Sequence, residues 1–279
     1  MKSEKSHLRK IKIVLEYDGS RFHGWQRQPK HLTVQQSVEE ALAILLQRKE
    51  PIIGSGRTDA GVHAFGQVAH CAVSDRYSDG ELLKGLNRLL PKDIVVREVA
   101  AVSDEFHARK SAIAKTYRYL VLNQGVRPAI LREYYWWVPH PLDYEKMKEA
   151  LEKIQGTHDF KGFQVKGSSI RETRRTLLFA GMDVAERIVQ IELIANGFLK
   201  QMARSIVGTL VDVGRGRFSP ERIEEILSLK DRSLAGRTAP AAGLYYISAH
   251  YDESQLRGIL QNPPTFSATT ADPPATRRV

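Results

Sequence analysis

The sequence contains a single cysteine, Cys71, among its 279 residues. One cysteine cannot form an intrachain disulfide, and it disfavours a zinc site built from thiolates. The charged segment 1–10 is followed by no apolar core of a signal peptide. Apolar runs are also short, and none approaches the roughly 18–20 residues that span a bilayer. We therefore expect a cytoplasmic protein with no membrane partner.

Acidic residues are too few to balance the basic ones, with 32 Asp and Glu against 42 Lys and Arg and a net charge of +10. Many soluble proteins are moderately basic, so the total alone leaves the partner open. The distribution says more, because the basic residues concentrate in the short stretches 21–30, 107–118, 161–175 and 200–217. Several of these stretches look like loops around Gly, Ser and Pro, which suits contact with phosphates. The pattern favours a polyanionic partner.

Hydrophobic periodicity in the first part of the chain predicts the order strand, helix, strand, strand, helix, strand. Residues 11–16 alternate and are β-branched, and Thr33 is placed to cap a helix over 34–47 with an apolar stripe. The remaining elements are expected at 51–54, 65–73, 79–89 and 94–102. This order is the split βαβ pattern of ferredoxin-like and RNA-recognition folds.

The second part of the chain also mixes helices with antiparallel strands, so we expect an α+β protein with two halves. Expected here are strands at 113–122 and 244–250, an aromatic run at 134–138, a hairpin at 176–184 and 187–195, and helices at 143–154, 198–212 and 219–228. The two halves can join their sheets or face each other across a cleft, and the pattern leaves both open. The domains are expected to be a flexible N-terminus at 1–9, halves at 10–110 and 111–253, and a Pro-rich disordered tail at 254–279.

The segment 54–64, Gly-Ser-Gly-Arg-Thr-Asp-Ala-Gly-Val-His-Ala, is the most informative in the chain. Its glycine pair suggests dinucleotide binding, but Asp59 stands where that fingerprint needs a third glycine, and no lysine or flanking helix follows. What remains is Arg57 and Asp59 on a glycine-rich turn that a substrate can approach closely. A tight turn whose Asp59 bonds its own backbone is the plain alternative, and the spacing alone favours it.

Residues 56–64 resemble the signature of the TruA family of tRNA pseudouridine synthases. Further segments resemble the same family in the same order, and together the matches cover roughly residues 11–250. These segments are 17–19 with 24–26, 115–119, 196–208 and 239–245. Ala203 and Ser205 stand where valine and asparagine are more often expected, mild departures that leave Arg204 in place.

The resemblance implies an enzyme that isomerises uridine to pseudouridine at positions 38, 39 and 40 of the tRNA anticodon stem-loop, with no cofactor and no metal. It implies the pseudouridine synthase fold, in which two ferredoxin-like or RNA-recognition-like halves with antiparallel sheets flank a central catalytic cleft, and a homodimer that grips the tRNA. Asp59 is then the catalytic residue. Its carboxylate either attacks C1′ or takes the 2′ proton, and the sequence leaves both open.

The resemblance also gives roles to four other side chains. Arg204 is expected to pair with Asp59, because a carboxylate desolvated in a cleft needs a cation to stay ionised; a solvated helix arginine is the alternative. Tyr117 is expected to stack on the target uracil and Leu244 to form the opposite apolar wall, with ordinary core residues as the alternative. Arg57 is expected to hold the space of the flipped uridine, or else to be a turn arginine facing solvent.

Two rival functions need different residues. A non-catalytic RNA-binding module would use the basic loops but would have no need of Asp59. A metal-dependent nuclease or hydrolase would need metal ligands. His63 and His70 have no carboxylate at ligand spacing, so no metal site is predicted there.

Overall fold

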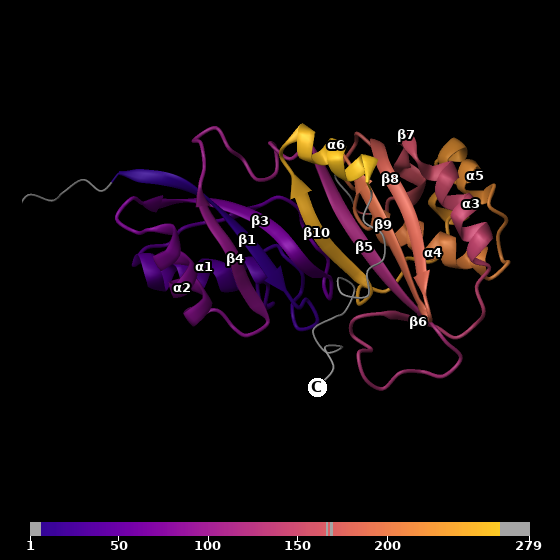
Figure 1. Cartoon of the computed structure of the whole chain (residues 1–279), viewed down its shortest axis with the longest axis horizontal. Coiled ribbons are helices and arrows are strands. Elements are labelled where there is room, and N and C mark those ends of the chain that lie inside the picture. The colour runs from indigo at the N-terminus through magenta and orange to yellow at the C-terminus, as the bar shows by residue number, and fades with distance from the viewer. Residues whose placement is uncertain (1–6, 166, 168–169, 263–279) are drawn as a thin grey trace, which may run out of the picture. The chain divides into compact units, whose positions relative to one another are not determined.

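The computed structural model describes residues 7–165, 167 and 170–262 (Figure 1). The chain divides into two compact units, each described by itself below. The first unit comprises Met1–Ile113 and Tyr246–Tyr251, and the second comprises Ala114–Tyr245 and Asp252–Val279.

The first unit is a mostly antiparallel sheet with two helices. Its elements follow the order β1 (Leu8–Tyr17), α1 (Val34–Leu46), β2 (Ile53–Gly54), β3 (His63–Ser74), α2 (Asp79–Leu89) and β4 (Ile94–Ala101). β1 runs between β3 and β4, antiparallel to both, and β2 pairs with β3. Helices α1 and α2 lie side by side, and α2 packs on β4 (Figure 1). The predicted order of strands and helices is confirmed.

Local sequence signals explain the elements of this unit. Alternate residues of β1, from Ile11 to Tyr17, are buried on one face, as the period of two predicts. Thr33 caps α1, because its side-chain Oγ1 accepts a hydrogen bond from the backbone N–H of Gln36 at 3.4 Å. The predicted cap and helix are confirmed.

The second unit is also α+β. Its elements are β5 (Ala114–Asn123), β6 (Trp136–Val138), α3 (Tyr144–Ile154), β7 (Gly156–Asp159), β8 (Arg174–Ala185), β9 (Ile188–Ala195), α4 (Met202–Gly214), α5 (Arg222–Leu229) and α6 (Glu253–Gln261), with short 3-10 turns at Phe160–Phe163 and Arg232–Leu234. Strands β5, β9, β8 and β7 pair in that order and are antiparallel, while β6 runs parallel to β5. Helix α3 packs on α4, α5 and β8. The hairpin prediction is confirmed as β8 and β9.

One strand passes from one unit to the other. β10 (Leu244–His250) begins in the second unit and ends in the first, since the units divide after Tyr245. The predicted second half at 111–253 therefore includes a short return segment that belongs to the first unit. No helix within the described parts of the chain is long and apolar enough to cross a membrane.

Several predicted boundaries differ from the structure by a few residues. Helix α4 begins at Met202, later than the predicted 198, because Gln201 adopts a left-handed conformation with φ of 58°. β1 begins at Leu8, inside the N-terminus predicted to be flexible at 1–9. Helix α6 occupies the start of the predicted tail at 254–279, because Asp252 caps its first turn and Leu256 is buried. Residues 1–6 and 263–279, which include most of that tail, lie outside the described residues.

Candidate active site

The turn between β2 and β3 carries both candidate site residues of the first unit. Asp59 is half-buried and Arg57 is exposed. The backbone N–H of Val62 donates to the carbonyl oxygen of Asp59 at 3.2 Å, which closes a tight turn. Gly61, inside this turn, has a φ of 78°, a left-handed conformation that glycine adopts at little cost. The turn thus presents a partly accessible carboxylate next to an exposed guanidinium.

The loop after β1 holds this turn through its backbone. The N–H of Trp25 donates to the carbonyl of Thr58 at 3.1 Å, and the N–H of Gly61 donates to the carbonyl of Phe22 at 3.2 Å. Gly24 has a φ of 85°, and a Cβ added to it would lie 2.4 Å from the carbonyl oxygen of Thr58. Only glycine allows this approach, so the loop can lie directly against the residue before Asp59.

Buried polar side chains hold the turn from the sheet side. The hydroxyl of Tyr17 lies 2.8 Å from Oγ1 of Thr58, and Nε2 of Gln67 donates to the carbonyl of Gly56 at 3.0 Å. The hydroxyl of Ser55 donates to Oε1 of Gln67 at 2.7 Å. Burial raises the pKa of Tyr17 to about 12, so its hydroxyl stays neutral and remains a hydrogen-bonding group at neutral pH.

The two histidines near the turn, His63 and His70, accept hydrogen bonds from backbone N–H groups of the protein. His63 Nδ1 lies 3.1 Å from the N–H of Gly19 and accepts its hydrogen bond, which requires the ring proton on Nε2. Oδ1 of Asp18 lies 3.2 Å from the same nitrogen, a contact that becomes an ion pair only when the ring is protonated. His70 Nδ1 accepts from the N–H of Ala108 at 3.1 Å. No group of three or more His, Cys, Asp or Glu among the residues the structure describes is arranged to hold a metal ion.

A second arginine lies within electrostatic range of Arg57. Burial, followed by the positive charge of Arg57, lowers the pKa of Arg109 from its usual value. The only sequence signal for this residue is its place in the basic stretch 107–118. The guanidinium of Arg57 on the Asp59 turn and that of Arg109 within its electrostatic range suit contact with a phosphate backbone.

In the second unit, Arg204 lies on the first turn of α4 and is half-buried. Its Nε donates to the carbonyl of Ala239 at 2.7 Å, and the N–H of Ala239 donates back to the carbonyl of Arg204 at 3.0 Å. One turn further on, a Cβ added to Gly208 would lie 1.7 Å from the carbonyl oxygen of Arg237. The segment 237–240 therefore lies directly on the helix and fixes the direction of the arginine side chain.

Tyr117 and Leu244 occupy neighbouring elements of the same unit. Tyr117 lies on β5 with 8% of its surface exposed, and its ring meets the ring of Phe198 edge-on at 4.8 Å between centroids. Leu244 begins β10 and is 5% exposed. The hydroxyl of Tyr119 donates to the carbonyl of Pro240 at 2.7 Å, so it ties β5 to the segment that leads to Leu244. Core residues are buried in the same way, so the role of this pair in base binding stays a prediction.

Comparisons with known proteins identify the family of this chain. The family model described as tRNA pseudouridine synthase matches residues 13–109 and 150–252. The chain is 42% identical over 244 residues to tRNA pseudouridine synthase A of Acetivibrio thermocellus, with 88% of this chain and 100% of that protein covered. It is 43% identical over 244 residues to the enzyme of the same name from Thermoanaerobacter pseudethanolicus, with 88% and 100% covered. The corresponding figures for Bacillus licheniformis are 43% over 246 residues, with 87% and 99% covered.

The matched segments contain the residues that form the candidate site. The first segment includes Arg57 and Asp59, and the second includes Arg204 and Leu244. Tyr117 falls between the two segments of the family model, within the longer span that the relatives cover. With an identity above 40% over nearly the whole length of these relatives, the chain belongs to the family of tRNA pseudouridine synthases, which are isomerases.

Proposed function

We propose that this protein isomerises uridine to pseudouridine at positions 38, 39 and 40 of the tRNA anticodon stem-loop, with Asp59 as the catalytic carboxylate. The observation that carries the proposal is the Asp59 turn, in which side-chain hydrogen bonds hold the residues just before a partly accessible carboxylate. A rigid, accessible carboxylate is what a reaction at a sugar carbon requires. Membership of the tRNA pseudouridine synthase family supports the reaction and the class of substrate.

The reaction conserves every atom of the nucleotide. The C1′–N1 bond breaks, the uracil rotates, and a C1′–C5 bond forms; C5 then loses its proton and N1 gains one. Asp59 acts either by attacking C1′, which forms an ester with the sugar, or by taking the 2′ proton, which forms a glycal. Both routes require the ionised carboxylate, and neither requires a cofactor or a metal.

Arg204 is proposed as the cation that keeps this carboxylate ionised. A bound uridine displaces water from the Asp59 turn, and desolvation disfavours a charged carboxylate unless an opposite charge compensates it. The side chain of Arg204 is half-buried and directed by Ala239, which suits a residue that must hold one orientation. The side chain of a freely solvated helix arginine would instead sample many rotamers.

The remaining predicted residues bind the extruded nucleotide. Tyr117 stacks on the uracil and Leu244 covers its other face, with stacking worth about 1–3 kcal/mol per base. Arg57 occupies the space that the flipped uridine leaves, and its exposure at the turn suits that role. The net charge of +10 favours tRNA as the partner, and we propose that the enzyme works as a homodimer in the cytoplasm.

The proposal is tested with Asp59→Asn on a tRNA that carries uridines at positions 38–40. We expect pseudouridine formation to fall at least about 1,000-fold, because the reaction loses its only nucleophile or base. Affinity for tRNA should stay within about twofold, because it comes mainly from phosphate contacts. Tritium release from 5-labelled uridine measures the rate, and a pseudouridine-selective chemical label maps the position. Isomerisation leaves the mass of the RNA unchanged, so mass alone cannot measure it.

Asp75→Asn is the matched control, since Asp75 is exposed on the same unit beyond the end of β3 and should retain full activity. Retained turnover in Asp59→Asn refutes the catalytic assignment. A wild-type protein that binds tRNA without forming pseudouridine would instead be an RNA-binding module. Cleavage of the RNA that EDTA abolishes would indicate a metal-dependent nuclease.

A further inference from the structure

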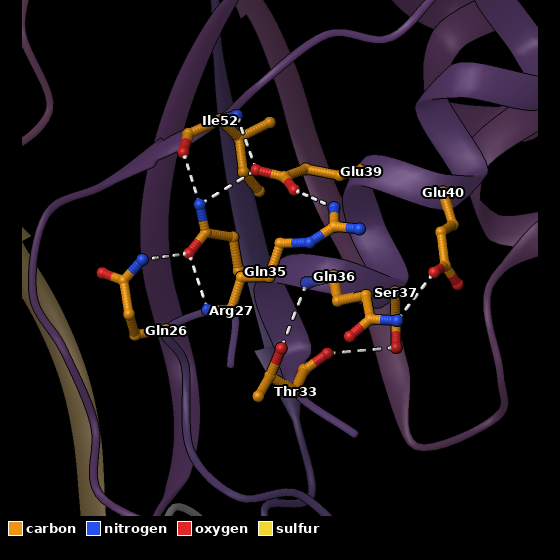
Figure 2. A network of polar contacts seen from close by, with 9 residues as sticks. All are labelled: Gln26, Arg27, Thr33, Gln35, Gln36, Ser37, Glu39, Glu40 and Ile52. Carbon is orange, nitrogen blue, oxygen red and sulfur yellow. Dashed lines mark hydrogen bonds and ion pairs between the residues drawn. The ribbon is translucent and has the colours of Figure 1, made fainter. Parts of the chain in front are cut away.

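Gln35, on the first turn of α1, uses the full hydrogen-bonding capacity of its side-chain amide (Figure 2). Its Oε1 accepts from Nε2 of Gln26 at 2.9 Å and from the backbone N–H of Arg27 at 3.0 Å. Its Nε2 donates to Oε1 of Glu39 at 2.9 Å and to the carbonyl of Ile52 at 3.1 Å. A primary amide offers two acceptor and two donor sites, so all four are occupied within the protein.

Glu39, one helical turn later, completes the same network. Its Oε1 also accepts from the backbone N–H of Ile52 at 3.2 Å, and its Oε2 accepts from the guanidinium of Arg27 at 2.8 Å. Ile52 therefore directs both its N–H and its C=O to side chains of α1, as a strand residue does to a neighbouring strand. We refer to Gln26, Arg27, Gln35, Glu39 and Ile52 as the Gln35 clamp.

The clamp joins the two segments that support the Asp59 turn. One is the loop that contains Trp25, whose N–H bonds the residue before Asp59 and whose carbonyl accepts from the N–H of Gln35 at 3.0 Å. The other begins at Ile52 and runs through Gly54 into the turn. The two segments touch beyond the clamp as well, because a Cβ added to Gly54 would lie 2.6 Å from the indole of Trp25.

We infer that Gln35 is a positioning residue for the isomerisation. Its amide fixes the loop at Gln26 and Arg27 relative to Ile52, and the position of Asp59 follows from those two segments. The inference rests on the proposed role of Asp59. Gln35 acts on the reaction only through the backbone it holds, so its loss changes the rate of the chemical step. Displacement of a reacting group by about 1 Å can cost about 100-fold in rate.

The test compares Gln35→Met with Gln36→Met. Methionine keeps the length of glutamine and removes all four hydrogen bonds of the clamp amide. Gln36 is the next residue of the same helix, and its Nε2 donates to Oε1 of Glu40 at 2.8 Å outside the clamp (Figure 2). The two variants therefore make the same chemical change, one inside the Gln35 clamp and one outside it.

For Gln35→Met we expect the single-turnover rate at saturating tRNA to fall about 10- to 100-fold, with the Kd for tRNA changed less than about twofold. For Gln36→Met we expect both quantities to stay within about twofold of the wild type. A second variant, Gln35→Glu, keeps the acceptor for Arg27 but places a carboxylate against Oε1 of Glu39, and it should lose rate as Gln35→Met does.

Thermal unfolding of each variant gives the folded fraction at the assay temperature, by which every rate is corrected. A corrected rate for Gln35→Met equal to that of the wild type overturns the inference. An equal loss in Gln35→Met and Gln36→Met, or a loss in tRNA affinity as large as the loss in rate, overturns it too. Failure of the proposed function is distinct, since the wild-type protein would then form no pseudouridine at all.

Discussion

The two units hold their candidate site residues by different means. In the first unit, the turn that carries Asp59 is fixed by side-chain hydrogen bonds from separate elements, such as those of Gln67 and Ser55, in addition to the backbone contacts of the loop at Trp25. In the second unit, Arg204 lies on a helix whose surface fits closely against the backbone of 237–240. A turn has no hydrogen-bond ladder of its own and must be held from outside, whereas a helix is already rigid and needs only a close-fitting neighbour.

This difference predicts opposite sensitivities for the two units. In the first unit, the Asp59 turn should respond to the loss of a single buried polar atom, because each such atom leaves partners without a hydrogen bond. The second should respond most to the gain of a single methyl group at a close backbone contact, because packed backbone cannot move aside at low cost. Three substitutions test this contrast.

The largest effect is expected for Gly208→Ala in the second unit. The new Cβ would lie 1.7 Å from the carbonyl oxygen of Arg237, so the segment bonded to Arg204 must move. Overpacking of this kind costs about 1–3 kcal/mol of unfolding free energy, and we expect the upper end, measured by urea unfolding. Gly258→Ala in α6 is the control, because its Cβ meets open space. There alanine should stabilise the helix by up to about 1 kcal/mol. Equal effects at the two glycines would refute the close packing.

A smaller effect is expected for Ser55→Ala in the first unit. The buried hydroxyl of Ser55 lies 2.7 Å from Oε1 of Gln67 and 2.7 Å from the hydroxyl of Tyr246. Its loss leaves both partners short of a hydrogen bond, which costs about 1–3 kcal/mol, and the strain falls on the Asp59 turn. Ser20→Ala removes an exposed hydroxyl from the same unit and should change stability by less than about 0.5 kcal/mol. A loss no greater than that of Ser20→Ala would remove the contrast between the units.

The fold could be predicted from the sequence where its signals are local. The cap at Thr33 and the hairpin of β8 and β9 each depend on residues close together in the chain, and both are confirmed. The start of α4 was missed because a left-handed conformation is normally predicted from a glycine, and residue 201 is a glutamine. Helix α6 was missed because its polar segment was grouped with the prolines that follow, although Asp252 is an ordinary capping residue.

The site was predicted from the family signature, and the residues that support it were not. Their partners are remote in the sequence: Tyr17 bonds across 41 residues, and Ser55 reaches Tyr246 across 191. No periodicity encodes such pairs. The available signal was a polar residue at a position expected to be buried, as with Gln67 on β3, which is fully buried.

The smallest effect concerns the pH dependence of the unfolding free energy, to which His70 of the first unit contributes. Burial, then the charges of His107 and Lys10, lowers the pKa of His70 from its usual 6.5. The folded state thus binds this proton less readily than the unfolded chain. The stability that the neutral ring contributes is present above about pH 6.5 and is lost as the pH falls from that value through the lowered pKa of the folded state.

His70→Asn removes this titration and keeps an oxygen to accept from the N–H of Ala108. Between pH 7 and pH 5 the free energy of unfolding should therefore fall less steeply in the variant than in the wild type. Carboxylates that titrate in the same range are common to both proteins, so the difference between the two slopes reports His70 and the interactions of its charge with His107 and Lys10. Hydrogen exchange locates the effect: in the wild type at pH 5, protection should fall first at the amides of β3, the strand that contains His70. An equal loss at β9 would mean that the units unfold as one, and the contrast between a turn held by side chains and a helix held by packing would then have no consequence for stability.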